Sequence, residues 1–380
     1  MESIIYPGFL ITAVGNGHER LVSMLTRRSV IGGLAAMPAV SASHAAEPVK
    51  IRFGLGFQFV ADNPFTSGSP LATAHDAFYF EQEFRNEPNV QIEWLRMKGQ
   101  GPQLNEAFAN GQIDFAGEGD LPSLIGRSRG LRTKILMASG TKTHTWLAVP
   151  PDSTIKSIEQ LRGAKVAIFR GTNRQLAVDK ILAAHGLSEK DLQVYNMDIA
   201  ASYAALATKN IDAAWGDSDI VALQDQGLAK VIYTTKGDDA RLTRNSCLNV
   251  SETFERDHPD LVARVVKVLV QAAFWSSQEA NRDALMDLWA KSGLSPRIIR
   301  AEFDGEALAY RMSPLLDPFV HEAYRSLARQ ARIYGLVRND VSVDDWFEPR
   351  YLLTALRELN LEHAWTQYDP SGKPLKQAPA

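Results

Sequence analysis

The chain has 380 residues and a formal net charge of −3, from 41 basic and 44 acidic side chains. This balance argues against a strongly basic nucleic-acid-binding protein, and a single cysteine excludes an internal disulfide and any cysteine-rich zinc or iron–sulfur site. The composition, 45% hydrophobic and 22% charged, is that of a globular protein, and the length favours two or more domains.

The N-terminal segment predicts an export signal. Arg27 and Arg28 precede a short stretch rich in glycine and alanine, and Ala45 ends a run of small residues. This order is typical of a secretory signal, and the paired arginines resemble the twin-arginine kind. We expect residues 1–45 to be removed, translation to start at Met24, and the mature protein to reside in the periplasm. The apolar stretch is too short for stable membrane insertion.

Apolar periodicity along the rest of the chain predicts alternating strands and helices. The predicted strands are 50–56, 90–95, 113–117, 134–138, 146–149, 165–169, 192–195, 211–215 and 230–233. The predicted helices are 75–85, 104–108, one starting at Pro122, 158–161, 175–185, 203–208, 261–276, 282–289, 319–334 and 349–359. Such alternation is typical of parallel sheets with right-handed crossovers, so we expect two α/β lobes and a helical C-terminal third.

Four stretches, taken in order, resemble a known family: 108–120, 149–163, 165–173 and 254–262. They resemble the nitrate/sulfonate/taurine-type periplasmic solute-binding proteins of ABC transporters, in the NMT1/THI5-like superfamily. The resemblance implies a bilobal α/β fold of the type II periplasmic-binding-protein kind, with ligand bound between the lobes. It places lobe I at 46–150 plus 243–380 and lobe II at 151–242. The chain is expected to cross near Pro150 and to return near 236–244.

One candidate ligand-binding element follows the strand predicted at 165–169. Gly171, Thr172 and Asn173 open a helix there, and Thr172 with Gln175 fits a capping box. Backbone N–H groups at a helix start have no intrahelical partner and carry the positive end of the helix dipole, so they bind oxyanions. A purely structural cap is the alternative, and the family resemblance favours ligand contact.

A second helix start is predicted on lobe I, at Glu118, Gly119 and Asp120. Gly119 allows close approach of the backbone, and Asp120 is a candidate N-cap. Two helix starts facing each other would hold a sulfonate. Glu118 departs from the small residue that the family resemblance implies, because a carboxylate would repel an anion unless it accepts from a ligand hydroxyl or ammonium group.

Four further residues are candidates for ligand contact. Gln58 lies in a first loop whose phenylalanines are candidates either for a ligand wall or for the core. Trp215 and Asp217 match the place where the resemblance implies an aromatic and an acidic residue at a strand end. His144 precedes the expected first crossing.

The sequence favours a binding protein over an enzyme. Cys247 lies in a predicted strand and is interpreted as a buried structural residue, and the histidines show no metal-ligand spacing. We therefore expect no catalytic residue, no metal and no cofactor. The expected function is that of a monomer that delivers a small organic sulfonate or sulfate ester to an ABC permease and its ATPase. A binder of nitrate, an aromatic carboxylate or a thiamine-precursor pyrimidine, and a desulfinase- or decarboxylase-like enzyme, remain alternatives on the same fold.

Overall fold

The computed structural model describes residues 47–56, 66–97 and 100–375. The predicted signal at 1–45 and the candidate Gln58, with its neighbouring phenylalanines, lie outside the described residues. Residues 46–380 form one compact unit. None of the helices in the described ranges is both long enough and apolar enough to cross a membrane.

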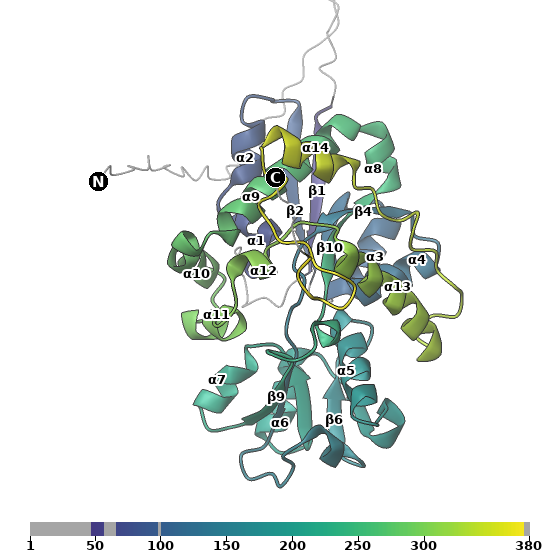
Figure 1. The fold of residues 1–380 in the computed structure, drawn as a ribbon, viewed down its shortest axis with the longest axis vertical. Coiled ribbons are helices and arrows are strands. Elements are labelled where there is room, and N and C mark those ends of the chain that lie inside the picture. Colours follow the sequence, from purple (N-terminus) through teal and green to yellow (C-terminus); the bar gives the residue numbers. More distant parts are fainter. Residues whose placement is uncertain (1–46, 57–65, 98–99, 376–380) are drawn as a thin grey trace, which may run out of the picture. The chain divides into compact units, whose positions relative to one another are not determined.

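The first sheet has five strands in the order β2-β1-β3-β10-β4 (Figure 1). Its strands are β1 (Val49–Leu55), β2 (Val90–Arg96), β3 (Phe115–Gly119), β4 (Thr133–Ala138) and β10 (Ser246–Ser251). β1 pairs in parallel with β2 and β3, whereas β10 runs antiparallel to β3 and β4.

The second sheet repeats this plan, in the order β7-β6-β8-β5-β9. Its strands are β5 (Trp146–Val149), β6 (Lys165–Ile168), β7 (Gln193–Asn196), β8 (Ala213–Gly216) and β9 (Lys230–Thr234). β6 pairs in parallel with β7 and β8, and β5 runs antiparallel to β8 and β9.

The expectation of wholly parallel sheets is therefore wrong, and chain connectivity explains why. β5 and β10 are the first strands that the chain forms after it passes from one sheet to the other. Each begins beside the end of a parallel strand: Trp146 pairs with Gly216, and Ser246 pairs with Gly119. A strand that enters at this edge must run away from it, opposite to the strands that finish there.

Helices surround both sheets. Those before β5 are α1 (Pro70–Asp76), α2 (Tyr79–Phe84), α3 (Gln100–Ala109) and α4 (Asp120–Ser128). Those between β6 and β9 are α5 (Asn173–Ala184), α6 (Ile199–Ala207) and α7 (Ile220–Asp225). Those after β10 are α8 (Glu252–Asp257), α9 (Pro259–Ser277), α10 (Arg282–Ala290), α11 (Pro296–Phe303), α12 (Leu308–Arg311), α13 (Pro318–Ile333) and α14 (Arg350–Glu358). We call the first sheet with its helices lobe I and the second sheet with its helices lobe II, a division that we propose from this topology.

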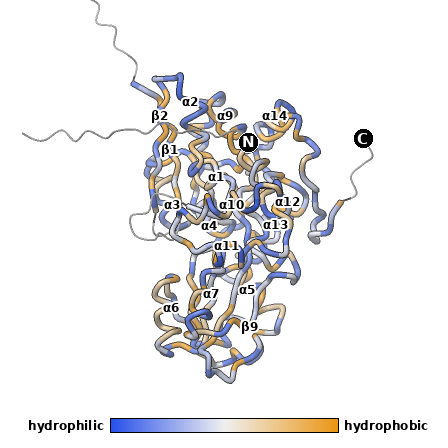
Figure 2. Tube along the Cα trace, turned by 90° about the vertical axis from the view of Figure 1, so that its left-hand side faces the viewer, coloured by the Kyte–Doolittle hydropathy of each residue, from blue (hydrophilic) through white to orange (hydrophobic). Residues whose placement is uncertain are grey.

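Packing in lobe I centres on α9, whose apolar residues join the strands of the first sheet in one buried cluster. Figure 2 shows the corresponding apolar colour along these strands and along α9. The single helix predicted at 75–85 is two helices, because Phe78 takes a left-handed conformation, with φ of 58°, between α1 and α2. A left-handed residue ends one helix and redirects the chain.

Two segments connect the lobes, residues 139–145 and 235–245. β5 already belongs to the second sheet, so the first crossing precedes Trp146 and does not lie near Pro150. The return segment includes the predicted 236–244. The two crossings are hydrogen-bonded to each other, since the N–H of Thr143 and the N–H of Arg244 each donate to the other residue's carbonyl at 2.9 Å.

An aromatic cage holds the first crossing. Lys142 takes a left-handed conformation, with φ of 56°, and is 2% exposed. Its Nζ lies 4.4 Å from the ring centroid of Tyr310, 5.0 Å from that of Phe319 and 4.1 Å from that of Tyr368. Burial lowers the pKa of Lys142 to about 8. The cage therefore holds a desolvated ammonium group against three aromatic faces.

Replacing Lys142 by methionine tests the cost of burying this charge. In the folded protein the pKa is about 8 instead of 10.5, so the unfolded chain binds more protons between these values. We expect the stability contributed by Lys142 to rise by about 2 kcal/mol from pH 8 to 10.5 and Lys142→Met to lack this rise. Urea unfolding at several pH values measures the difference. Identical pH dependence in both proteins would contradict the lowered pKa.

Candidate ligand-binding site

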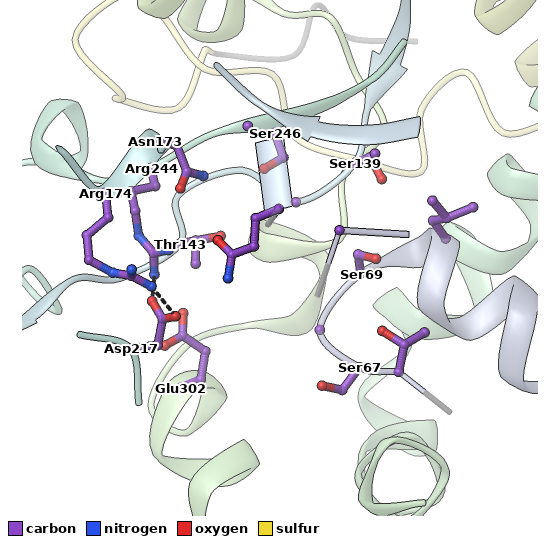
Figure 3. A pocket seen from close by; sticks show the side chains of 18 of the residues that line it. Ser67, Ser69, Ser139, Thr143, Asn173, Arg174, Asp217, Arg244, Ser246 and Glu302 are labelled. Atoms are coloured by element: carbon purple, nitrogen blue, oxygen red, sulfur yellow. Dashed lines mark hydrogen bonds and ion pairs between the residues drawn. The ribbon is translucent and has the colours of Figure 1, made fainter. Parts of the chain in front are cut away.

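A cavity of about 310 Å³ lies between the two lobes and is lined by residues of both (Figure 3). Its walls include the ends of β1 and β3, the starts of α1, α4 and α5, both crossings and α11. Ligands of α/β proteins bind outside the carboxyl ends of parallel strands, where loops lead into helices. The cavity occupies that place on both sheets at once.

The two predicted helix starts meet at this cavity. Gly119 and Asn173 both line it, and a Cβ added to Gly119 would lie only 2.9 Å from the Asn173 side chain. Glycine is thus required here for close approach of the two lobes. Gly119 is itself the N-cap of α4, so Asp120 is the first helical residue and not the cap that the sequence predicted.

The start of α5 differs in detail from the prediction. Thr172 is the N-cap and lines the cavity, but the predicted capping box is wrong. The Thr172 hydroxyl donates to the carbonyl of Phe169 at 2.8 Å, and the Gln175 side chain accepts from the N–H of Gly171 at 2.8 Å. The Thr172 side chain does not cap α5. The N–H of Gln175 donates to the carbonyl of Thr172 at 3.1 Å, which leaves the N–H groups of the first two residues of α5 as candidates for binding an anion.

Two buried arginines share one carboxylate at the lobe II side of the cavity. Arg174, in the first turn of α5, and Arg244, in the return crossing, both contact Asp217, which follows β8 (Figure 3). The arginine side chains are only 2% and 7% exposed, while that of Asp217 is 31% exposed. Burial would raise the pKa of Asp217, but the two guanidinium groups outweigh it and lower the pKa. Asp217 is therefore ionised at neutral pH.

One carboxylate does not use all the donors of two guanidinium groups. Among the described residues, Nε and Nη1 of Arg174 and Nε of Arg244 have no hydrogen-bond partner. A buried donor left without a partner costs about 1–3 kcal/mol, and more when the group is charged. The cluster of Arg174, Arg244 and Asp217 keeps one excess positive charge and unpaired donors, which is the chemistry that an oxyanion complements.

Neutral hydroxyl groups lie on the other walls of the cavity. Ser67 and Ser69 precede α1, Ser139 and Thr143 lie in the first crossing, and Ser246 begins β10 (Figure 3). Ser69 caps α1 by accepting from the N–H of Ala72 at 3.1 Å. Hydroxyl groups donate or accept according to the ligand, so this side adds polar contacts without adding charge.

Of the ten predicted ligand-binding residues, four line the cavity: Gly119, Thr172, Asn173 and Asp217. Their contact with a ligand remains a prediction. Gly171 lies outside this lining, in a groove beside α3 and α4. Asp120 is 2% exposed and accepts from the N–H of Leu121.

Two other predicted residues also lie away from the cavity, because each has partners of its own. Trp215 packs in the core of lobe II. His144 contacts Glu306 through Nε2 at 2.9 Å, and both residues line a separate hollow.

Glu118 lies under the cavity and does not line it. Its side chain is buried, and Oε2 accepts from the Ser123 hydroxyl at 2.9 Å. Burial raises the pKa of Glu118 to about 8. The carboxyl group is therefore mainly protonated at pH 7, and the repulsion expected from an acid at this position is absent.

Five charged residues of the lining were missed by the sequence analysis: Arg174, Asp219, Arg244, Glu302 and Arg311. Arg174 is only two residues from the predicted Thr172, and its position in the first turn of α5 was the available signal. Glu302 and Arg311 pair with each other at 2.6 Å. The described residues contain no group of three histidine, cysteine, aspartate or glutamate side chains that could hold a metal ion.

A bilobal α/β fold with a polar cavity between its lobes defines the class of periplasmic binding proteins. The chain belongs to the NMT1/THI5-like family, whose profile matches residues 80–282. The expected family and fold class are thus confirmed.

Among similar proteins, two are named for sulfonate binding and one is an enzyme that shares the fold. A Bacillus subtilis protein provisionally assigned as an aliphatic sulfonates-binding protein is 27% identical over 226 residues, 58% of this chain and 66% of that protein. The match therefore spans just under two thirds of that relative. The periplasmic sulfonate-binding protein SsuA from Methylobacillus flagellatus, also a provisional assignment, has a TM-score of 0.75 and 28% identity, covering 85% of this chain and 98% of that one. The desulfurization enzyme DSZB shares the fold, with a TM-score of 0.63 and 18% identity, covering 82% of this chain and 99% of the enzyme.

Replacing Glu118 by glutamine tests the protonation state under the cavity. The folded-state pKa is about 8 against an ordinary 4.5, so the folded protein holds the proton more strongly and wild-type stability falls as pH rises between these values. Glutamine cannot ionise. We expect the melting temperature of Glu118→Gln, relative to wild type, to increase from pH 5 to pH 8, and a constant difference would contradict a protonated Glu118.

Proposed function

We propose that this chain is the periplasmic substrate-binding component of an ABC importer and that it captures a small organic sulfonate or sulfate ester in the cavity between its lobes. The observation that carries the proposal is the pair of buried arginines, Arg174 and Arg244, with unpaired N–H donors beside that cavity. A sulfonate offers three oxygen acceptors and a permanent single negative charge. It matches the spare donors and, below about pH 6, where the nearby Asp219 is mainly protonated, the excess charge as well.

Similarity supports the same ligand class. The Bacillus subtilis relative and the Methylobacillus flagellatus structure are both named for sulfonate binding. The protonated Glu118 under the cavity adds no negative charge at pH 7. The acidic residue that the sequence left as an objection to a sulfonate therefore does not oppose one.

Binding by lobe closure follows from where the cavity residues lie. Asn173, Arg174 and Asp217 belong to lobe II, whereas Ser69 and Ser139 belong to lobe I or the crossing that leaves it. A ligand that contacts both sides shifts the population towards the closed form, since its contacts are complete only there. The two hydrogen-bonded crossings provide the hinge.

The burial and the raised pKa of Cys247 support a binding protein and not an enzyme with a cysteine nucleophile. Cys247 is 0% exposed, lies in β10 and does not line the cavity. Burial raises the pKa of its thiol to about 12. A nucleophilic cysteine needs a lowered pKa and access to substrate, and Cys247 has neither.

The cellular context completes the proposal. The twin-arginine-like segment of the sequence supports export to the periplasm, and the expected partners are an ABC permease and its ATPase. We propose that the mature protein acts as a monomer without a cofactor.

Asp219 adds a pH-dependent charge to the site. It lines the cavity two residues after Asp217 and contacts the hydroxyl of Tyr203. Burial, followed by the charge of Asp217, raises the pKa of Asp219 to about 6. Above this pH a second carboxylate offsets the excess charge of the arginine pair.

A ligand screen combined with two arginine variants tests the proposed function. We expect mature protein starting at Ala46 to be stabilised by sulfonates or sulfate esters, by about 2.7 kcal/mol at a ligand concentration one hundred times the dissociation constant. Arg174→Met should weaken binding at least 30-fold, because truncating one partner of a buried charged contact costs about 2–5 kcal/mol. Thermal shift identifies the ligand, and calorimetry measures the affinities.

Arg170→Met is the matched control. Arg170 precedes the same helix, but its side chain is 47% exposed and pairs with Glu189. We expect less than a threefold change in affinity. If only nitrate, aromatic carboxylates or pyrimidines stabilise the protein, the ligand is not a sulfonate. Equal losses of affinity in Arg174→Met and Arg170→Met would contradict a special role of Arg174.

The charge on Asp219 predicts a pH profile for binding. Sulfonates stay monoanionic from pH 5 to 8, so a change in their affinity reports a change in the protein. We expect affinity to fall about three- to tenfold as pH rises through 6, because ionised Asp219 opposes the ligand charge. Asp219→Asn should bind with nearly constant affinity over this range. A profile unchanged by the substitution would exclude Asp219 as its cause.

A further inference from the structure

The cavity is larger than an oxyanion requires. A water molecule needs only about 10–15 Å³ of such space, whereas the cavity has about 310 Å³. A ligand anchored at Arg174 and Arg244 therefore has room for a body beyond its charged group. The chemistry of the remaining lining indicates what that body is.

Helix α11 presents an apolar stripe to the cavity. Ile298, Ile299, Glu302 and Phe303 all line it, and positions separated by three or four residues lie on one face of a helix. Leu294, just before the helix, extends the lining. Ile299 and Phe303 are buried, but Leu294 and Ile298 keep exposed surface that a ligand would cover.

Along α11 the apolar Ile298 and Ile299 precede the charged Glu302. Glu302, labelled in Figure 3, pairs with Arg311 at 2.6 Å, and both residues line the cavity. Ile298 lies one helical turn before Glu302, about 5–6 Å further along the axis. The oxyanion and the apolar body would thus occupy different parts of the cavity.

The acidic groups of the lining have partners within the protein. Asp217 contacts two arginines, Glu302 contacts Arg311, and Asp219 contacts Tyr203. A positively charged ligand tail would have to compete with these contacts. It would also displace water from Ile298 without forming a hydrogen bond there, which is unfavourable for an ammonium group.

We propose that α11 makes the site selective for sulfonates with an apolar body, with Ile298 and Leu294 as the specificity-determining residues. This inference rests on the proposed function. The family profile matches residues 80–282, and α11 lies beyond them. The apolar residues of α11 that line the cavity are therefore outside the matched segment.

Calorimetry with n-alkanesulfonates from methanesulfonate to hexanesulfonate, together with benzenesulfonate and taurine, tests the proposal on the mature chain. We expect affinity to rise two- to fourfold with each methylene group once the alkyl chain reaches Ile298, as burial of a CH₂ predicts. Taurine, with its ammonium tail, should bind at least tenfold more weakly than propanesulfonate. Ile298→Ala and Ile298→Ser should lower the affinity for hexanesulfonate more than tenfold and leave that for methanesulfonate unchanged.

Ile333→Ala is the matched control, since Ile333 is 77% exposed at the end of α13 and does not line the cavity. It should change no affinity, and melting temperatures show whether each variant is folded. Sulfonate affinities that do not depend on chain length, or that Ile298→Ala lowers equally at every length, would overturn the role of α11 and leave the proposed function standing. Failure of every sulfonate to bind wild-type protein would overturn both.

Discussion

The cleft depends on one carboxylate shared by two buried guanidinium groups. Asp217 follows the last residue of β8, Arg174 lies in α5 and Arg244 lies in the return crossing, so the cluster ties two elements of lobe II to the segment that leaves it. Removing charges from water costs several kcal/mol per ion, which a single partner repays only with complete hydrogen bonding. Here the bonding is incomplete, because three N–H donors lack partners among the described residues. Arg174 and Arg244 both line the cavity, and a bound oxyanion is the acceptor that we propose for these donors.

The C-terminal helices hold the two crossings between the lobes. Arg311 donates to the carbonyl of Thr141 at 3.3 Å and pairs with Glu302, and Glu302 accepts from the N–H of His144 at 3.0 Å. Lys236 of the return crossing donates to the carbonyl of Ala301 at 2.8 Å. Both crossings are thus attached to α11 or its neighbours, so the wall that we assign to ligand selection is also connected to the hinge.

Periodicity predicted most of the fold, and the errors have local causes. Strands such as β1 and β6 have alternating or continuous apolar residues that the pleated backbone requires, so they were found within a few residues of their bounds. Strand direction was missed because an antiparallel strand entering from another lobe has the same periodicity as a parallel one. The family resemblance placed the first crossing near Pro150, whereas the chain had already formed β5 before that residue.

The candidate site was harder to predict, because burial and pairing depend on residues distant in sequence. Gly119, Thr172 and Asn173 were found because helix starts have a local signature. Arg174 had only a weak signal, its position in the first turn of α5: an arginine there is usually solvated, and only the contact with Asp217 shows that this one is buried and paired. Thr172 is the N-cap residue of α5, but its side chain does not cap the helix, because its hydroxyl donates to the carbonyl of Phe169 instead. Glu118 seemed to oppose an anion because sequence does not reveal a raised pKa.

Contacts between the lobes are both apolar and polar. Leu176 of α5 is buried in one cluster with Leu121 and Leu124 of α4. Gly119 approaches Asn173 at a second place, and Arg297 of α11 pairs with Asp225 of α7 at a third. The Arg297 and Asp225 side chains are 64% and 39% exposed, and such surface pairs contribute about 0–1 kcal/mol. A bidentate contact with a buried arginine contributes more, because both groups are removed from solvent. In our proposal a ligand that contacts both lobes adds to these contacts, so that occupancy favours the closed form, which a permease can then distinguish from the open one.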